Sequence, residues 1–319
     1  MTPARLATPW SRALGLAAPL VNAPMGGVAG GRLAAAVSRA GALGMVGVGS
    51  AGSAAGLRRE LAHLEGLGRP FGVGLVGWAV EREPELLDVA LAAAPALVAV
   101  SFGDDLGWVD RVRAAGAAAA VQVADASAAR RAADAGADVV VARGAEGGGH
   151  GTPAMGTLPL LDAVLDVVDV PVLAAGGVGG PRTLAAVLAA GAQGAWVGTA
   201  FAACTESTLA PGARERMRLA RGEDTVVTTV VDEALGYPWP THLPARVLRN
   251  DLTDGAVPSD GAAVRRAFAA GDWDVATVDA GQGVGLVGQP RPAAAVVEWL
   301  AAGAAERLRQ VGDAALDAD

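Results

Sequence analysis

The sequence contains no lysine, and each of its 25 basic residues is an arginine. Without an ε-amino group the protein cannot form a lysine Schiff base with a carbonyl substrate, so that class of catalysis is excluded. The 33 acidic residues outnumber the basic ones and give a net charge of −8. Because an acidic surface repels the phosphates of DNA and RNA, we expect no nucleic-acid partner.

Cysteine is almost as scarce, since Cys204 is the only one in 319 residues. A single cysteine excludes an intrachain disulfide framework and a cysteine-rich metal site, and this usage fits a reducing cytoplasm. Long hydrophobic runs are missing as well, because the apolar stretch at 89–100 is broken by Pro95 and is too short to span a bilayer. The N-terminus lacks the continuous apolar segment of a signal peptide. We therefore expect a cytoplasmic protein that does not bind a membrane.

Eight short apolar runs are present, each rich in β-branched residues and apolar on both alternating faces. This pattern is typical of parallel strands that are buried between a barrel interior and a coat of helices. The runs begin at Pro19, Leu43, Phe71, Ala96, Ala117, Ala137, Val170 and Gly194. Between them, apolar residues recur at helical spacing, and Ala-Gly pairs supply helix C-caps before several strands. A closed barrel and an open doubly wound sheet both fit this alternation; the even spacing favours a (β/α)8 TIM barrel.

The pattern changes after residue 221. Residues 222–290 are rich in Gly, Pro, Asp and Trp, and they predict a loop-rich lid over the barrel mouth with one short helix near AAVRRAFAAG. The segment PAAAVVEWLAAGAAERLRQ then predicts a closing helix that starts near Pro292. We therefore divide the chain into a barrel (1–221), a lid or substrate region (222–290) and a C-terminal helix that packs on the barrel (291–319).

Glycines follow the last two barrel strands, in AAGGVGGPRTL and VGTAF. Glycine lets backbone amides approach an anion closely, and the loops after strands seven and eight of a barrel are a frequent phosphate site. We therefore predict a phosphate-bearing cofactor around Gly176, Gly177, Gly198 and Thr199. A purely structural turn is the alternative. A Rossmann fingerprint fits less well, because the loop comes late and no acidic residue ends a following strand.

The segment RGAEGGGHG (143–151) begins where the sixth strand ends, which places it at the catalytic face of a barrel. The surrounding glycines allow a planar ring to lie against the backbone, and His150 can take or give a proton near neutral pH. His63 and His242 are interpreted as structural or surface residues. We predict no metal site, since no second histidine or carboxylate pair is placed on a neighbouring strand end.

Taken together, these segments resemble the nitronate monooxygenase family, formerly called 2-nitropropane dioxygenases. The resemblance runs through NAPMGGVAGG, FGVGL, RGAEGGGHG, VPVLAAGGVGG, GAWVGTAF, LPARVLRN and DAGQGVGLVGQ, which together extend over nearly the whole chain. It implies a barrel that binds FMN and uses His150 as the catalytic residue. The expected cofactor-binding residues are Pro24, Met25, Gly26, Gly74, Gln122, Arg143, Gly148, Gly176, Gly177, Val197, Gly198 and Thr199.

Three positions depart from the family pattern. The family usually has Asn at the position of Gly74 and Gln at the positions of Arg143 and Trp196, so three polar contacts to the flavin are altered. A permanent cation at Arg143 would favour the anionic reduced flavin or pair with a ligand anion. The alternative for Arg143 is a salt bridge to Glu146 or a surface contact.

The resemblance implies oxidation of alkyl nitronates or nitroalkanes by FMN, with O2 as the second substrate. One alternative is an NAD(P)H-dependent reductase of a quinone or an enoyl thioester, in which Arg246 and Arg249 of the lid would bind a nucleotide phosphate. Another is a non-catalytic flavin-binding protein. The sequence is compatible with a homodimer, and it fixes neither the oligomeric state nor the substrate.

Overall fold

Eight parallel strands follow one another around a barrel, and each coincides with one of the apolar runs of the sequence. Their order in the sheet is β1-β9-β8-β6-β5-β4-β3-β2. The strands are β1 (Leu20–Asn22), β2 (Gly44–Gly47), β3 (Phe71–Val76), β4 (Leu97–Ser101), β5 (Ala118–Val123), β6 (Val139–Arg143), β8 (Val172–Ala175) and β9 (Gly194–Val197). The structure is a computed structural model that describes residues 6–316, with side chains up to residue 314. Residues 1–5 of the expected barrel segment and 317–319 of the closing-helix segment lie outside the described residues.

The barrel closes between β1 and β2, where the strand ladder is reduced to a single bridge between Val21 and Leu43. The buried side chain of Asn22 bonds across this seam: its Oδ1 accepts from the Met45 N–H at 2.8 Å, and its Nδ2 donates to the Met45 carbonyl at 2.9 Å. Buried backbone groups need partners, and here a side-chain amide supplies them. The sheet is therefore closed, and the open doubly wound alternative is excluded.

Side chains that point into the barrel form a cluster of their own, separate from the cluster between strands and helices. The inner cluster includes Val21, Met45, Val141 and Leu173, together with the 5% exposed Trp196 on β9. The large indole of Trp196 therefore fills the interior. A bulky apolar side chain at this position stabilises the barrel by packing, which is a different role from the polar contact expected of a glutamine.

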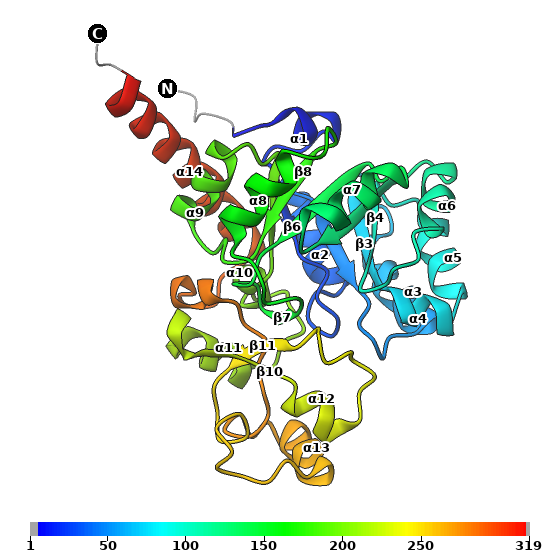
Figure 1. Cartoon of the computed structure of the whole chain (residues 1–319), viewed down its shortest axis with the longest axis vertical. Coiled ribbons are helices and arrows are strands. Elements are labelled where there is room, and N and C mark those ends of the chain that lie inside the picture. The colour runs from blue at the N-terminus through cyan, green and yellow to red at the C-terminus, as the bar shows by residue number, and fades with distance from the viewer. Residues whose placement is uncertain (1–5, 317–319) are drawn as a thin grey trace.

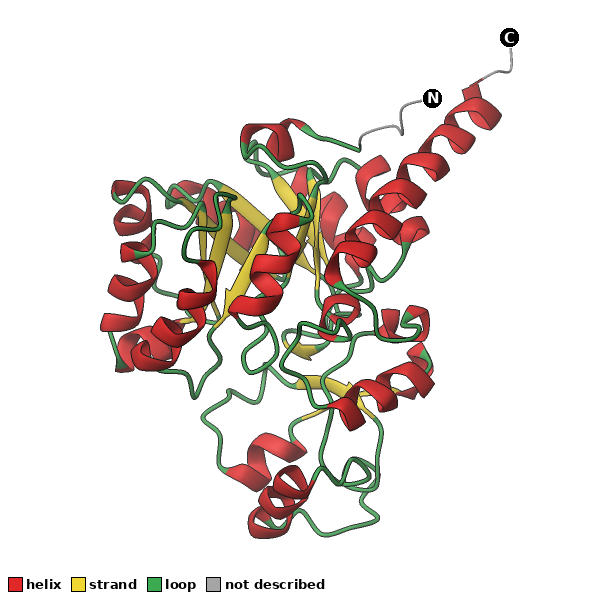
Figure 2. Ribbon diagram, turned by 180° about the vertical axis from the view of Figure 1, so that it is seen from behind, coloured by secondary structure: helices red, strands yellow, loops and turns green. Residues whose placement is uncertain are grey.

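The helices cover the outside of the barrel, as Figure 2 shows with red helices around yellow strands. Several follow the expected rules at their ends: Ser53 and Asp125 cap N-termini, and Gly41 and Gly136 have positive φ after C-termini. The helices of this layer are α1 (Pro9–Ala13), α2 (Gly31–Arg39), α3 (Ala54–Leu61), η1 (Ala62–Leu64), α4 (Gly77–Arg82), α5 (Glu85–Ala92), α6 (Trp108–Ala114), α7 (Ala126–Asp134), α8 (Thr157–Leu165), α9 (Pro181–Ala189) and α10 (Thr199–Ala202). The next helix, α11 (Pro211–Leu219), packs with residues of the lid instead, and Figure 1 shows it beside the lid strands.

The lid segment contains more regular structure than the sequence predicted. Instead of one short helix it has two, and its strands β10 and β11 join β7 of the glycine-rich loop in an antiparallel sheet of three strands. These elements are β7 (Gly149–His150), η2 (Gly222–Asp224), β10 (Thr225–Thr228), α12 (Val230–Leu235), β11 (Ala245–Leu248), α13 (Gly261–Ala270) and η3 (Gln282–Leu286). In Figure 1 the lid, coloured yellow to orange, lies at the end of the molecule opposite to the two chain termini.

The closing helix α14 (Ala293–Leu316) packs against α9 and α2, as the sequence predicted. Its buried residues Val296, Val297, Leu300 and Ala304 belong to the outer core cluster. Among the described residues, none of the helices combines the length and the apolar character that crossing a membrane requires.

Candidate active site

The loops after β8 and β9 have the geometry of an anion site. Gly176 and Gly177 have φ values of +101° and +68°, a region of backbone conformation that favours glycine. They, Gly198 and Thr199 are partly exposed, whereas the strands beneath, including Val197, are buried. A Cβ added to Gly198 would meet only Met25 Sδ at 3.6 Å and Ala23 Cβ at 3.8 Å. Open space therefore lies above backbone amides that can receive a phosphate group.

The segment after β1 forms the neighbouring wall of the mouth. Pro24 and Met25 are partly exposed, and Gly26 is exposed where its backbone approaches Gly49. A Cβ added to Gly74 would lie 2.2 Å from Pro24 Cγ, which is far inside van der Waals contact. Gly74 therefore makes room for Pro24, and the asparagine usual in the family would not fit beside Pro24 in this position. A direct contact of Gly74 or Gly26 with a cofactor stays a prediction.

Gly281 joins the loop after β9 to the glycine-rich loop. Its N–H donates to Thr199 Oγ1 at 3.0 Å. On its other side, a Cβ added to Gly148 would lie 2.5 Å from the Gly281 nitrogen, so the two backbones are in close contact. The segment before η3 thus brings together the loops after β6 and β9, which are about 50 residues apart in sequence.

Arg143 lies at the end of β6 with only 7% of its surface exposed. Its Nη2 donates to the carbonyls of Gly147, Gly148 and Gly149 at 2.9, 3.2 and 3.1 Å. Burial, followed by the charge of Arg246, lowers the pKa of Arg143 from 12.5 to about 10, so it is still a cation at neutral pH. The structure gives Arg143 the role of holding the glycine-rich loop. Its contact with a flavin stays a prediction.

Two other polar candidates have different positions. Glu146, the alternative partner of Arg143, accepts bonds from the N–H and the hydroxyl of Thr157 and so fixes the start of α8. Gln122 is partly exposed on β5, where alternation places its side chain on the same inner face as Ala120. Gln122 is therefore available at the mouth, and its role in cofactor binding stays a prediction.

His150 is held by two residues of the lid. Its Nε2 lies 2.9 Å from Asp232 Oδ2, and the two side chains are 16% and 9% exposed. The imidazole also stacks on the indole of Trp239 with a centroid separation of 3.5 Å and an angle of 3°. Both the direction of the ring nitrogens and the plane of the ring are therefore fixed.

An aromatic wall continues from Trp239 across the mouth. Trp239 meets Trp78 edge-on at 4.6 Å and Phe102 edge-on at 5.0 Å between ring centroids. Phe102 follows β4 with a φ of +65°, which is costly for a residue with a side chain and occurs preferentially at functional sites. Among the described residues, Trp78 Nε1 is a buried polar atom without a hydrogen-bond partner. The wall is apolar, its rings meet at steep angles, and it contains one unpaired donor.

Asp279 lies beside the glycine-rich loop, since a Cβ on Gly149 would be 3.5 Å from its Oδ2. Asp279 is an exposed residue, and yet protein atoms surround its carboxylate closely enough for burial to raise its pKa above 3.8. Asp232 raises the pKa of Asp279 further, whereas His150 and Arg143 oppose this shift.

Sequence reasoning missed Asp232, Asp279 and the wall residues Trp78 and Phe102. Asp279 begins the segment DAGQGVGL, a signal that was present without a role attached to it. Asp232 stands in a short helix far from His150 in sequence and carries no local signal. His63 and His242 are exposed, and burial raises the pKa of the Cys204 thiol to about 12, which keeps it unreactive. The described residues contain no group of three or more metal-ligating side chains.

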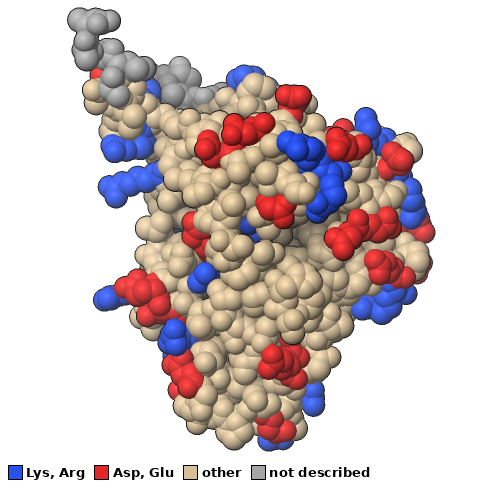
Figure 3. Space-filling view, in the orientation of Figure 1, with Lys and Arg blue, Asp and Glu red and all other residues tan. Residues whose placement is uncertain are grey.

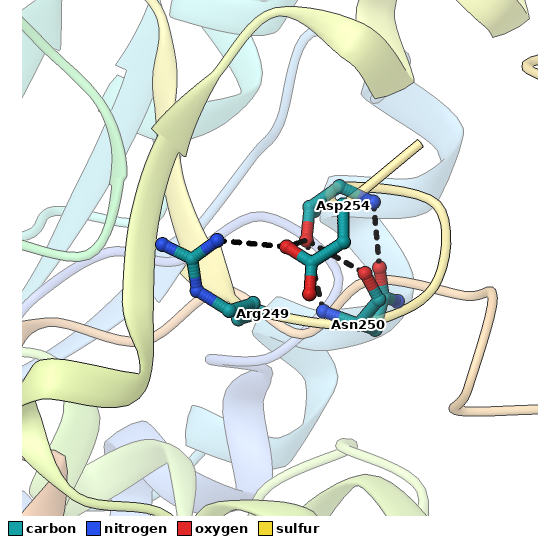
Figure 4. Close-up of polar contacts among 4 residues, drawn as sticks. Arg249, Asn250 and Asp254 are labelled. Atoms are coloured by element: carbon teal, nitrogen blue, oxygen red, sulfur yellow. Dashed lines mark hydrogen bonds and ion pairs between the residues drawn. The ribbon is translucent and has the colours of Figure 1, made fainter. Parts of the chain in front are cut away.

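The arginines considered for a nucleotide phosphate are occupied. Arg246 Nε donates to the Ala145 carbonyl at 3.0 Å, and its Nη1 donates to Thr225 at 3.1 Å. Arg249 pairs with Asp254 at 2.7 Å next to Asn250, as Figure 4 shows. Both arginines therefore hold the lid together, and this geometry gives no support to a nucleotide-phosphate site at these side chains.

Comparison with known proteins identifies the family. The nitronate monooxygenase family matches residues 8–86 and 79–303. A nitronate monooxygenase of Pseudomonas aeruginosa is 32% identical over 91% of this chain and 97% of its own. A relative in Rhodococcus jostii, named as a hydroxy-methyl-oxo-octahydroindene-carboxyl-CoA dehydrogenase, is 36% identical over 78% of this chain and 67% of its own.

Solved structures agree with this assignment. FabK from Thermotoga maritima superimposes with a TM-score of 0.83, at 30% identity over 96% of this chain and 98% of its own. The nitroalkane oxidase of Streptomyces ansochromogenes gives a TM-score of 0.81, at 34% identity over 95% of this chain and 99% of its own. The TIM barrel is confirmed, and so is an oxidoreductase of a flavin-dependent family. The chain belongs to the nitronate monooxygenase family.

Proposed function

We propose that this protein binds FMN and oxidises alkyl nitronates or nitroalkanes with O2. The observation that carries the proposal is the position of His150, which the loop-to-loop contact at Gly281 connects to Thr199 of the predicted phosphate site. The family and the structural likeness to a nitroalkane oxidase support the same reaction class. An anion site on the barrel mouth suits the phosphate of the cofactor, and a proton-transfer group beside it serves the reaction of a neutral nitroalkane.

The residues of the mouth fit FMN. Gly177, Gly198 and Thr199 would hold the phosphate, and Pro24, Met25 and Gly148 would contact the ring. The open space at Gly198 supplies room for the phosphate. When bound, the flavin supplies the two-electron acceptor for the substrate and the group that O2 reoxidises.

The protein's own side chains act on the substrate proton and on water. His150 takes the proton from the α-carbon of a neutral nitroalkane, and its ring stays in place through Asp232 and Trp239. The wall of Trp78, Phe102 and Trp239 supplies apolar surface that excludes water from this step. The alkyl part of the substrate would lie against the same wall.

The decisive experiment is anaerobic mixing of the purified flavin-loaded protein with an alkyl nitronate. We expect the visible absorbance of the flavin to bleach, and admission of O2 to restore it. Parallel samples with NADH and NADPH test the reductase alternative. A flavin that nitronates and nitroalkanes leave oxidised would exclude the proposed reaction.

The identity of the cofactor has a separate test. Chromatography of the flavin released by heat distinguishes FMN from FAD. Gly198→Val should fold, because a Cβ at this position makes only ordinary contacts, while its methyl groups fill the space of the phosphate. We expect this variant to be purified with much less flavin, and full occupancy would contradict the phosphate site.

A second candidate is an oxidoreductase that acts on a CoA thioester. It is favoured by the Rhodococcus relative, whose identity of 36% exceeds that of the Pseudomonas nitronate monooxygenase. Acyl-CoA compounds therefore belong in the same anaerobic series. Bleaching by an acyl-CoA but not by a nitronate would select this candidate.

A further inference from the structure

The lid supplies both groups that fix His150. Asp232 lies on α12, and Trp239 lies in the loop that follows, whereas His150 belongs to the glycine-rich loop, 82 residues before Asp232. The same lid also pairs β11 with β7, where Ala245 faces His150. Docking of the lid and orientation of the histidine therefore depend on one set of contacts.

The contact with Asp232 determines which ring nitrogen is free. An ionised carboxylate can only accept hydrogen bonds, so His150 Nε2 must carry the hydrogen across the 2.9 Å contact. In the neutral imidazole the other nitrogen, Nδ1, then has the lone pair. The stack on Trp239 prevents the ring from rotating out of this arrangement.

We propose that Asp232 is a positioning residue, which holds His150 as the Nε2–H tautomer so that Nδ1 is the base. This inference rests on the proposed function. In the step, the C–H bond of the neutral nitroalkane breaks, an N–H bond forms at Nδ1, and the electron pair stays on the substrate as the nitronate. The negative charge of Asp232 stabilises the imidazolium that results.

Other charged groups near His150 do not replace Asp232. Asp279 lies beside Gly149, where the charge of His150 acts on its pKa, and Arg143 has its Nη2 on three carbonyls of the loop. Among the described contacts of the His150 ring, the hydrogen bond goes to Asp232 alone. A nitronate has already lost the α-proton, so its oxidation needs no base. The proposal therefore predicts that loss of Asp232 slows the reaction of a neutral nitroalkane but not that of a nitronate.

The test compares Asp232→Asn with wild type in anaerobic flavin reduction by a neutral nitroalkane and by its preformed nitronate. We expect the rate with the nitroalkane to fall by about 100-fold, which is typical for loss of general base catalysis. We expect the rate with the nitronate to stay within about twofold of wild type, because no proton is removed. Glu233→Gln is the matched control, because it removes one negative charge from the neighbouring exposed position of α12.

Equal nitroalkane rates in Asp232→Asn and wild type would overturn the proposal. An equal loss with both substrates would also overturn it, because it would indicate general damage to the lid. A second measurement is independent of turnover: the 15N shifts of the imidazoles report the tautomer, and only three histidines have to be assigned. We expect Nε2–H for His150 in the wild type and a different tautomer ratio in Asp232→Asn.

The two measurements keep this inference apart from the function. If the wild-type flavin reacts with neither substrate, the proposed function fails, and the tautomer alone decides the role of Asp232. An Nδ1–H tautomer of His150 in the wild type would contradict the positioning role whatever the substrate is.

Discussion

Arg143 shows how one buried cation shapes the mouth of the barrel. Three consecutive carbonyls of the glycine-rich loop point at its Nη2, so the loop wraps around the guanidinium. Glycines lack the side chains that would otherwise hold such a loop in place, and the arginine supplies the fixed point instead. Because the loop backbone is held in one conformation, it also determines the direction in which the His150 side chain points. Arg143 therefore acts on the site through the backbone.

Arg143→Met should lower the free energy of unfolding by about 2–3 kcal/mol, because methionine leaves three carbonyls without their charged donor. Urea unfolding with excess FMN measures this effect. Arg249→Met is the matched control: it removes the same side chain from the exposed pair with Asp254, which contributes about 0–1 kcal/mol. Equal losses in the two variants would show that Arg143 does not hold the loop.

Trp196 and Gly74 are two of the positions at which this chain differs from the family pattern. Trp196 fills the barrel interior, and Gly74 yields space to Pro24, so each substitution is explained by packing. The sequence could identify that polar residues had been replaced. It could not show what the replacements contact, because their neighbours come from strands that are far apart in the chain.

Asn22 acts on the scale of an element, because it joins the first strand of the barrel to the second. One backbone bridge and the amide of Asn22 hold this seam, whereas β4 and β5 share three paired positions. The seam between β1 and β2 is thus the weakest part of the closed sheet, and a side chain determines its strength.

Asn22→Leu should lower the free energy of unfolding by about 2–4 kcal/mol, since it leaves the buried N–H and carbonyl of Met45 unpaired. Hydrogen exchange of the native protein would locate the change. The amide of Met45 should exchange faster, while amides in the seam of β4 and β5 should keep their protection. An unchanged urea midpoint would argue against a role of Asn22 in closing the barrel.

The eight barrel strands were predictable because each is a continuous apolar run and glycine marks the helix ends before several of them. The sheet of β7, β10 and β11 was not, because its strands contain two to four residues and β7 pairs with β11 across about 95 positions. The same reason hid Asp232, which approaches His150 only through this pairing. The loops predicted to bind phosphate and His150, by contrast, follow barrel strands directly, and barrel topology places them at the mouth.

On the scale of the whole molecule, the candidate active site lies where the barrel and the lid meet. The barrel supplies the loops after β6, β8 and β9, and the lid supplies Asp232, Trp239 and Asp279. On the face shown in Figure 3, acidic and basic side chains are interspersed, and they are sparser over the lower part of the molecule. The charged groups that bear on His150, by contrast, lie between barrel and lid. For Asp279, whose pKa is raised, we expect protonation to affect how firmly the two parts hold together.

Asp279 makes this coupling measurable as a dependence of stability on pH. Its pKa is raised in the folded protein, chiefly by burial, so the folded state binds a proton that the unfolded state has already released above pH 3.8. The stability that this group contributes is complete below that value, and it is lost as the pH rises through the raised pKa. Asp279→Asn removes the loss, since an amide does not ionise.

We therefore expect the melting temperature of Asp279→Asn minus that of the wild type to increase as the pH is raised from about 4 to 8. Both proteins are measured with excess FMN, so that a difference in flavin occupancy does not contribute. Asp104→Asn is the control, because it neutralises an exposed carboxylate in the loop after β4. A difference that is constant with pH, or one that shifts in favour of the wild type as the pH rises, would show that the carboxylate of Asp279 is not desolvated between barrel and lid.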